Sequence, residues 1–121
     1  PAALESEFKQ SRFIEQIMVI GESEKMPAAL IQLNFEFIKN WGIRHNHSII
    51  DITSDKKILK RIQKEVDFYN LKFGKWEQIK KFEITPDEWT IDSGHLTPTM
   101  KMKRKVIQEK YKNLVQKIYN S

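Results

Sequence analysis

Cysteine is absent from this chain of 121 residues. Its absence excludes disulfide bridges, a thiolate zinc site and a cysteine nucleophile, and it is compatible with a reducing compartment. The four glycines are scattered, so the chain has no glycine-rich phosphate-binding loop. No apolar run approaches the roughly 18 residues of a membrane-spanning helix, and acidic residues stand where a signal peptide would be basic and then apolar. These absences predict a soluble domain that lacks the common nucleotide-loop and thiol chemistries.

The overall composition is that of an ordinary globular domain. Hydrophobic residues make up 40% of the chain and charged residues 31%, which is enough apolar material for a core and too little charge for disorder. A chain of this length can bury a core without a structural metal. We therefore predict one domain that spans residues 1–121, and the abrupt start at Pro1, with no cap or linker before it, suggests a fragment of a larger protein.

The positive charge is concentrated at one end of the chain. Residues 94–121 contain seven Lys or Arg and one acidic residue, a formal charge of +6, whereas residues 1–93 hold 14 basic and 15 acidic residues, a charge of −1. Such a localised field suggests that the C-terminal end meets an anion, such as a phosphate, a nucleic acid or a membrane surface. A solvated lysine-rich helix face explains the charge equally well.

Runs of β-forming residues predict a small sheet. They lie at 13–20, 28–33 and 79–84, and the short connection between the first two runs makes those strands neighbours in a hairpin. A turn at 92–94 brings its flanking residues together as a further short hairpin. The sequence thus predicts an α+β fold in which about three strands and a short hairpin carry packed helices.

Capping residues and apolar spacing predict the helices. Asn34 and Ser54 are expected N-caps, Gly42 is expected to end the helix that Asn34 begins, and Thr85 with Glu88 forms a capping-box pattern. Another helix is predicted at 2–10. The last one is predicted from Arg104 to Tyr119, with an apolar stripe of Ile107, Tyr111, Leu114, Val115 and Ile118.

Two groups of polar residues could suggest a reactive site, and both have simpler explanations. Ser93 beside His95 resembles a hydrolytic dyad only if the spacing is ignored, since a tight turn explains the pair better. His45 and His47, with Asp51 nearby, offer possible metal ligands. Residues two apart in an extended loop share no helical ligand face, however, and no second cluster completes a shell. We therefore predict no metal site.

The stretch HLTPTMKMKRKVI at 95–107 is chemically the most informative. It places four cations within five residues, after a Thr-Pro-Thr turn. If 100–103 is extended, alternation directs Met100 and Met102 to one side and Lys101 and Lys103 to the other. Lys101 would then project from a loop stiffened by proline, as a movable point charge for a phosphate or carboxylate oxygen.

Two other classes of function could explain the same basic segment. A nucleic-acid-binding module would use the tail for phosphate contacts, but no aromatic residue is interleaved among 101–105, and Tyr111 and Tyr119 are expected to be packed rather than stacked on bases. A peripheral module for anionic membranes would need a helix that exposes large apolar residues. The apolar stripe of the tail is instead sized for the protein's own core.

The order of several segments closely resembles the C-terminal domain of long-chain fatty-acid-CoA ligases. These segments are FIEQIMVIG at 13–21, ALI at 29–31, ITPDEWT at 84–90 and LTPTMKMKRKVI at 96–107. The ligases belong to the adenylate-forming AMP-binding superfamily, with other acyl-CoA synthetases, firefly luciferases and peptide-synthetase adenylation domains. The resemblance covers nearly the whole chain and implies a small mobile lid domain that follows a large N-terminal domain.

The resemblance also implies a reaction and a role for one residue. The family uses Mg-ATP to convert a carboxylate to an acyl-adenylate and pyrophosphate, and then transfers the acyl group to the thiol of CoA. By its position in the last motif, Lys101 matches the lysine that enters the active site during adenylation and is withdrawn when the domain rotates. Many superfamily members have glycine directly before this lysine, where this chain has Met100.

Several further expectations depend on the resemblance. ATP, Mg²⁺ and CoA would serve the full-length enzyme, and none is expected bound to this fragment, which alone should be inactive. The expected partners are the enzyme's own N-terminal adenylation domain and its substrates, with no nucleic acid. Lys103 and Arg104 are candidate contacts for phosphate or CoA. The expected location is cytoplasmic, with peripheral membrane association of the parent enzyme as a further option.

Overall fold

The computed structural model describes residues 2–21 and 26–120, and its centre is a three-stranded sheet with the order β1-β2-β3. Strand β1 (Ile14–Ile20) pairs antiparallel with β2 (Ala28–Leu33), which pairs parallel with β3 (Lys81–Ile84). The three predicted strands and the adjacency of the first two are confirmed. Most of the predicted connection between β1 and β2, at 22–25, lies outside the described residues.

Strand β2 is the centre of the core because both of its faces are covered. All six of its residues are buried, which fits the run AALIQL, where apolar residues do not alternate with polar ones. Gln32 is the polar exception, and its side-chain oxygen accepts a hydrogen bond from the backbone amide of Trp89 at 2.9 Å. This bond attaches the segment after β3 to the middle of the sheet.

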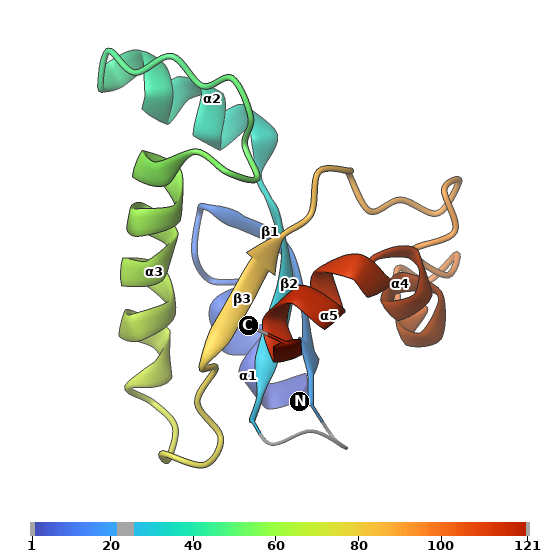
Figure 1. The fold of residues 1–121 in the computed structure, drawn as a ribbon. Helices are drawn as coiled ribbons and strands as arrows, with labels where there is room; N and C mark the ends of the chain where they lie inside the picture. Colours follow the sequence, from blue (N-terminus) through green and yellow to red (C-terminus); the bar gives the residue numbers. More distant parts are fainter. Residues whose placement is uncertain (1, 22–25, 121) are drawn as a thin grey trace.

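Helices cover the two faces of the sheet separately (Figure 1). One core lies between the sheet and α1 (Ala2–Phe8), α2 (Phe35–Arg44) and α3 (Lys56–Asn70). A second core lies between the opposite face and α4 (Arg104–Lys110) and α5 (Lys112–Asn120). The predicted α+β class is therefore confirmed. The apolar stripe of the tail is also confirmed, because its members pack in the second core.

Two of the predicted helix boundaries, at Gly42 and at Ser54, are wrong. Gly42 lies inside α2 rather than ending it, and a Cβ at this position would come within 3.0 Å of the His47 carbonyl oxygen and of Ile49. Glycine is therefore used for close packing rather than as a stop. The N-cap of α3 is Asp55, not Ser54, because the Asp55 carboxylate accepts the Ile58 amide at 2.9 Å.

The helix predicted after Thr85 does not form, so the capping-box interpretation is wrong. Thr85 is fully buried, and its hydroxyl accepts the indole N–H of Trp89 at 3.0 Å. A tertiary partner thus takes the hydroxyl that a cap would need. The single C-terminal helix is also wrong, since Tyr111 divides it into α4 and α5 with backbone angles of φ −110° and ψ 30°.

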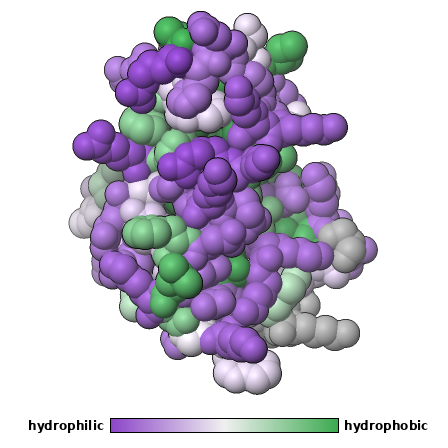
Figure 2. Space-filling model, turned by 90° about the vertical axis from the view of Figure 1, so that its left-hand side faces the viewer, coloured by the Kyte–Doolittle hydropathy of each residue, from purple (hydrophilic) through white to green (hydrophobic). Residues whose placement is uncertain are grey.

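The face that carries α2 and α3 is largely hydrophilic, and its hydrophobic side chains form separate patches (Figure 2). None of the helices in the described part of the chain is long and apolar enough to span a bilayer. The basic residues of the C-terminal tail are mostly exposed. Two of their ion pairs, Lys112 with Glu109 and Lys117 with Glu83, are both 3.5 Å long and contribute little stability.

Candidate functional site: the lysine loop

The basic segment begins in a small hairpin at residues 95–103, which we call the Lys101 loop. At its base, the amide of Lys103 donates to the carbonyl of His95 at 2.8 Å. Nearer the tip, the amide of Thr97 donates to the carbonyl of Lys101 at 2.8 Å. The backbone therefore fixes the Lys101 loop at two points, one on each side of the residue pair that faces the core.

That pair is Leu96 and Met102, which form an antiparallel bridge. Leu96 is buried, and Met102 packs against the second core. The turn predicted at 92–94 is present, and the amides of His95 and Leu96 both donate to the Thr90 carbonyl across it. The strand-like pairing does not form across this turn, however. It forms across the next turn, where Leu96 and Met102 pack their side chains together.

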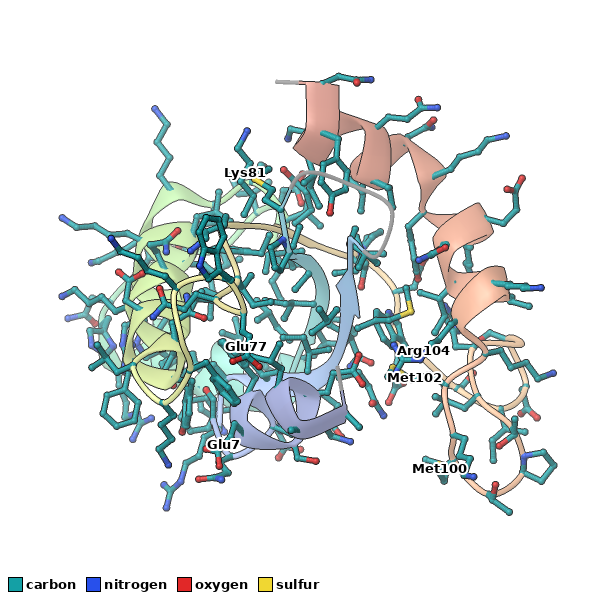
Figure 3. The ribbon with its side chains drawn as sticks, turned by 90° about the horizontal axis from the view of Figure 1, so that it is seen from below. Glu7, Glu77, Lys81, Met100, Met102 and Arg104 are labelled. Carbon is teal, nitrogen blue, oxygen red and sulfur yellow. The ribbon has the colours of Figure 1, made fainter. Side chains whose placement is uncertain are left out.

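Met100 has a left-handed backbone, with φ +67°. The amide of Met100 donates to the carbonyl of Thr97 at 2.8 Å, so residues 98–100 form a three-residue hairpin loop between the paired residues Thr97 and Lys101. Such loops place a left-handed residue, usually glycine, just before the second strand. The extended geometry considered for 100–103 is therefore not adopted at Met100. This residue is 58% exposed at the outer end of the loop (Figure 3).

This geometry places Lys101 directly after the left-handed residue. The side chain of Lys101 is exposed, and within residues 2–21 and 26–120 its ammonium group has no hydrogen bond or ion pair. It lines a groove of about 400 Å³ between the Lys101 loop and α1. The amide of Lys101 also donates to the Thr97 hydroxyl at 3.1 Å, so an ordered backbone holds a free side chain.

Arg104, predicted as a phosphate or CoA contact, is bound to a carboxylate of this chain. Its two terminal nitrogens donate to the two oxygens of Glu5 at 2.9 and 2.6 Å. Glu5 is only 6% exposed, and it also accepts the amide of Val19 at 2.8 Å. This bidentate pair connects the end of the Lys101 loop to α1, across 99 positions of sequence. Lys103 is exposed.

A chain of polar side chains with a buried centre, His95 and Tyr111, and exposed ends, Ser93 and Asp87, lies next to the loop. Ser93 Oγ lies 2.6 Å from His95 Nδ1, and His95 Nε2 lies 2.9 Å from the hydroxyl of Tyr111. The same hydroxyl donates to Asp87 Oδ2 at 3.1 Å. The rings of Trp89, His95 and Tyr111 are nearly parallel, with centroids at most 6.4 Å apart. We call the Ser93, His95, Tyr111 and Asp87 side chains the His95 chain.

The electrostatics of the His95 chain favour neutral rings. Burial, with a smaller contribution from the charge of Lys110, lowers the pKa of His95 below its usual value. Burial and then the carboxylate of Asp87 raise the pKa of Tyr111. Only the adjacency of Ser93 and His95 was visible in the sequence, because Asp87 and Tyr111 are brought to them by the packing of α4 on the sheet.

The two other histidines have structural partners. His45 Nδ1 lies 2.8 Å from the carbonyl oxygen of Trp41, and His47 Nε2 lies 2.7 Å from Asp55 Oδ2. Across the described ranges, no three His, Asp or Glu side chains are grouped closely enough to share a metal ion. The histidines therefore help to fix α2 and the N-terminus of α3.

The fold is that of the C-terminal part of adenylate-forming enzymes. A structure of the adenylation domain of a carboxylate reductase from Mycobacterium chelonae superposes with a TM-score of 0.80 over 99% of this chain and 18% of that chain, at 20% identity. A Mycobacterium tuberculosis fatty acyl CoA synthetase gives a TM-score of 0.54 over 92% of this chain and 17% of that chain, at 18% identity.

The sequence places the chain within a family. Residues 1–121 match the AMP-binding enzyme C-terminal domain, and the chain belongs to that family. The long-chain-fatty-acid-CoA ligase FadD15 of M. tuberculosis is 36% identical, over 99% of this chain and 21% of that protein. Human long-chain-fatty-acid-CoA ligase 1 is 25% identical, over 100% of this chain and 18% of that protein. The chain thus spans about a fifth of the length of these relatives.

Proposed function

We propose that this chain is the C-terminal domain of a long-chain fatty-acid-CoA ligase and that Lys101 is its adenylation residue. The observation that carries the proposal is an exposed ammonium without a partner in the described chain, held on an ordered hairpin in a member of the AMP-binding C-terminal family. The similarity to long-chain ligases supports the choice of substrate. In the first reaction, a fatty-acid carboxylate oxygen attacks the α-phosphorus of ATP, and pyrophosphate leaves.

Lys101 would reduce the repulsion between the two anions that react. Its ammonium would lie between the carboxylate and the α-phosphate and would stabilise the charge that develops during the in-line displacement. A flexible side chain on a fixed backbone suits this role, because the ammonium can follow the moving charge while the Lys101 loop keeps its position. In the second reaction, the thiol sulfur of CoA attacks the acyl carbon and AMP leaves.

We further propose that the domain changes its position between the two reactions. Rotation away from the N-terminal domain after adenylation would withdraw Lys101 and make room for CoA, as a lid does. Lys103 and Arg104 are proposed secondary contacts for phosphate or CoA. Lys103 is available for this without rearrangement, whereas Arg104 would have to divide its guanidinium between Glu5 and the anion.

The other components follow from the same proposal. ATP, Mg²⁺ and CoA would be used by the full-length enzyme, although the described residues of this domain supply no group of metal ligands. The N-terminal adenylation domain would be the partner, and the domain alone would be inactive. We propose a cytoplasmic location. A nucleic-acid role is less favoured, because Tyr111 is buried and Tyr119 packs on the second core.

The test separates the two half-reactions in the full-length enzyme. Lys101→Ala should lower pyrophosphate release from ATP and palmitate strongly, to a small residual rate, because the charge between the two anions is lost. Thioester formation from pre-made palmitoyl-adenylate and CoA should be retained. Lys105→Ala is the matched control, since Lys105 is also an exposed cation of the same segment. Unchanged adenylation in Lys101→Ala would refute the assignment, and the Lys101 loop would then be an ordinary basic patch.

A further inference from the structure

The His95 chain meets the Lys101 loop at the residue that closes the hairpin. The carbonyl of His95 accepts the amide of Lys103 at the base of the loop, while the ring of the same residue is fully buried between Ser93 and Tyr111. A displacement of His95 would therefore also move the carbonyl that closes the base of the Lys101 loop. The side-chain contacts of one residue are thus coupled to the geometry of the loop.

The hydrogen bonds of the His95 chain all donate in one direction, from the Thr90 and Ser93 end toward Asp87. The amide of Thr90 can only donate, and it points at His95 Nδ1 at 3.4 Å, so Nδ1 is the acceptor and Nε2 carries the proton. Nε2 then donates to the Tyr111 oxygen, and the Tyr111 hydroxyl donates to Asp87. One tautomer and one ring orientation satisfy every member of the chain.

The His95 chain also contacts the sheet through Trp89. Trp89, whose ring lies parallel to that of His95 at 6.0 Å, receives two anchors. Its amide donates to Gln32 on β2 at 2.9 Å, and its indole N–H donates to Thr85 at 3.0 Å. The position of the His95 ring is therefore set relative to β2, the most deeply buried element of the domain, and not only relative to the exposed loop.

We propose that Tyr111 is a positioning residue for adenylation: its hydroxyl fixes the His95 ring, and the ring fixes the base of the Lys101 loop and so the place that the ammonium reaches. This inference rests on the proposed function of Lys101. Tyr111 lies at the break between α4 and α5, where its backbone leaves helical geometry. From this position the Tyr111 hydroxyl contacts both His95 and Asp87.

The test is Tyr111→Phe in the full-length enzyme. The ring and its packing remain, but His95 Nε2 loses its acceptor and Asp87 loses its donor. Since a displacement of about 1 Å at a reacting group can cost roughly a hundredfold in rate, we expect kcat for pyrophosphate release to fall roughly ten- to a hundredfold. The KM values for ATP and palmitate should change by less than about twofold, because Tyr111 touches neither substrate.

Tyr119→Phe is the matched control. It also removes a tyrosine hydroxyl, here from α5, the helix that follows Tyr111. The hydrogen bond that is lost is one of 2.9 Å to the Met26 carbonyl, away from the Lys101 loop. Adenylation should be nearly unchanged in this variant. If Tyr111→Phe and Tyr119→Phe lower adenylation equally, or if Tyr111→Phe lowers thioester formation from palmitoyl-adenylate as much as adenylation, the role of Tyr111 is only structural and the inference is overturned.

A double variant distinguishes this inference from the proposed function. Once Lys101→Ala has removed the ammonium, Tyr111→Phe should cause no further loss of adenylation, because there is nothing left to position. Full additivity of the two losses would overturn the inference while leaving Lys101 in its role. If Lys101→Ala alone leaves adenylation intact, the proposed function fails first.

Asp87→Asn keeps the inference testable if Tyr111→Phe does not fold. Asp87 is exposed, so the substitution should be tolerated, and its amide oxygen can still accept from Tyr111 while the charge is lost. Adenylation should fall less in Asp87→Asn than in Asp87→Ala. Two-bond proton-nitrogen spectra of the 121-residue chain should show His95 with the proton on Nε2. A proton on Nδ1, or equal rates for the two Asp87 variants, would contradict the proposed hydrogen-bond direction.

Discussion

Replacing Arg104 with methionine should destabilise the domain substantially, because it leaves Glu5 buried without its charged partner. The Glu5 side chain is 7% exposed and the Arg104 side chain 44%. Removing one member of a fully buried pair costs about 3–5 kcal/mol. Since water reaches nearly half of the arginine, we reduce this figure and expect a loss of about 2 kcal/mol in the free energy of unfolding.

The measurement is urea unfolding of the 121-residue chain, with thermal unfolding as a second probe. The midpoint should fall without a change in the m-value, and the Tm should fall by roughly 6 to 12 °C. Methionine retains much of the aliphatic packing of arginine, so the loss reports mainly the charge and its hydrogen bonds. A double-mutant cycle with Glu5→Gln isolates the pair from other contacts of Arg104 and should give a coupling energy of roughly 1–2 kcal/mol.

Lys112→Met provides the comparison. Its ion pair with Glu109 is 3.5 Å long, and the two side chains are 62% and 76% exposed, so its removal should change the free energy of unfolding by less than about 0.5 kcal/mol. The reasoning is refuted if Arg104→Met destabilises the chain no more than Lys112→Met, or if the losses in the Glu5 and Arg104 variants add without coupling. The pair would then be a surface contact that happens to be bidentate.

Three other variants test particular features of the structure. Met100→Gly should leave the fold intact and lower the strain of the left-handed backbone by about 1 kcal/mol, partly offset by glycine entropy; a marked loss of stability would contradict the φ of +67°. Asp55→Ala should cost about 1–2 kcal/mol in urea unfolding, because the amide of Ile58 loses its cap; no change would exclude Asp55 as the cap. The lowered pKa of His95 means that the unfolded chain binds the extra proton first, so the free energy of unfolding should fall as the pH drops below about 6.5. His95→Gln should reduce this slope, and an equal slope would show that the ring is not held neutral.

Much of the fold could be predicted because local patterns and tertiary packing agree. The apolar run at 28–33 predicts a strand, and the stripe of Ile107, Tyr111 and Ile118 predicts a helix face that packs on a core. Lys101 could also be singled out, because a proline-stiffened turn before a cluster of cations is visible in the sequence. In these cases the side chains needed for the inference are neighbours in the chain.

Other features depended on contacts between distant residues. The Thr85 hydroxyl could cap a helix, but Trp89 and the β2 backbone take it instead. Arg104 was expected to face an anion of the substrate, and its partner here is Glu5, on the first helix. Asp87, His95 and Tyr111 meet only when α4 packs on the sheet. The sequence by itself determined the three strands and the apolar stripes of the helices, and it singled out Lys101 as the candidate lysine. Only the tertiary structure decided which polar groups pair, because a buried donor must find an acceptor wherever packing places one.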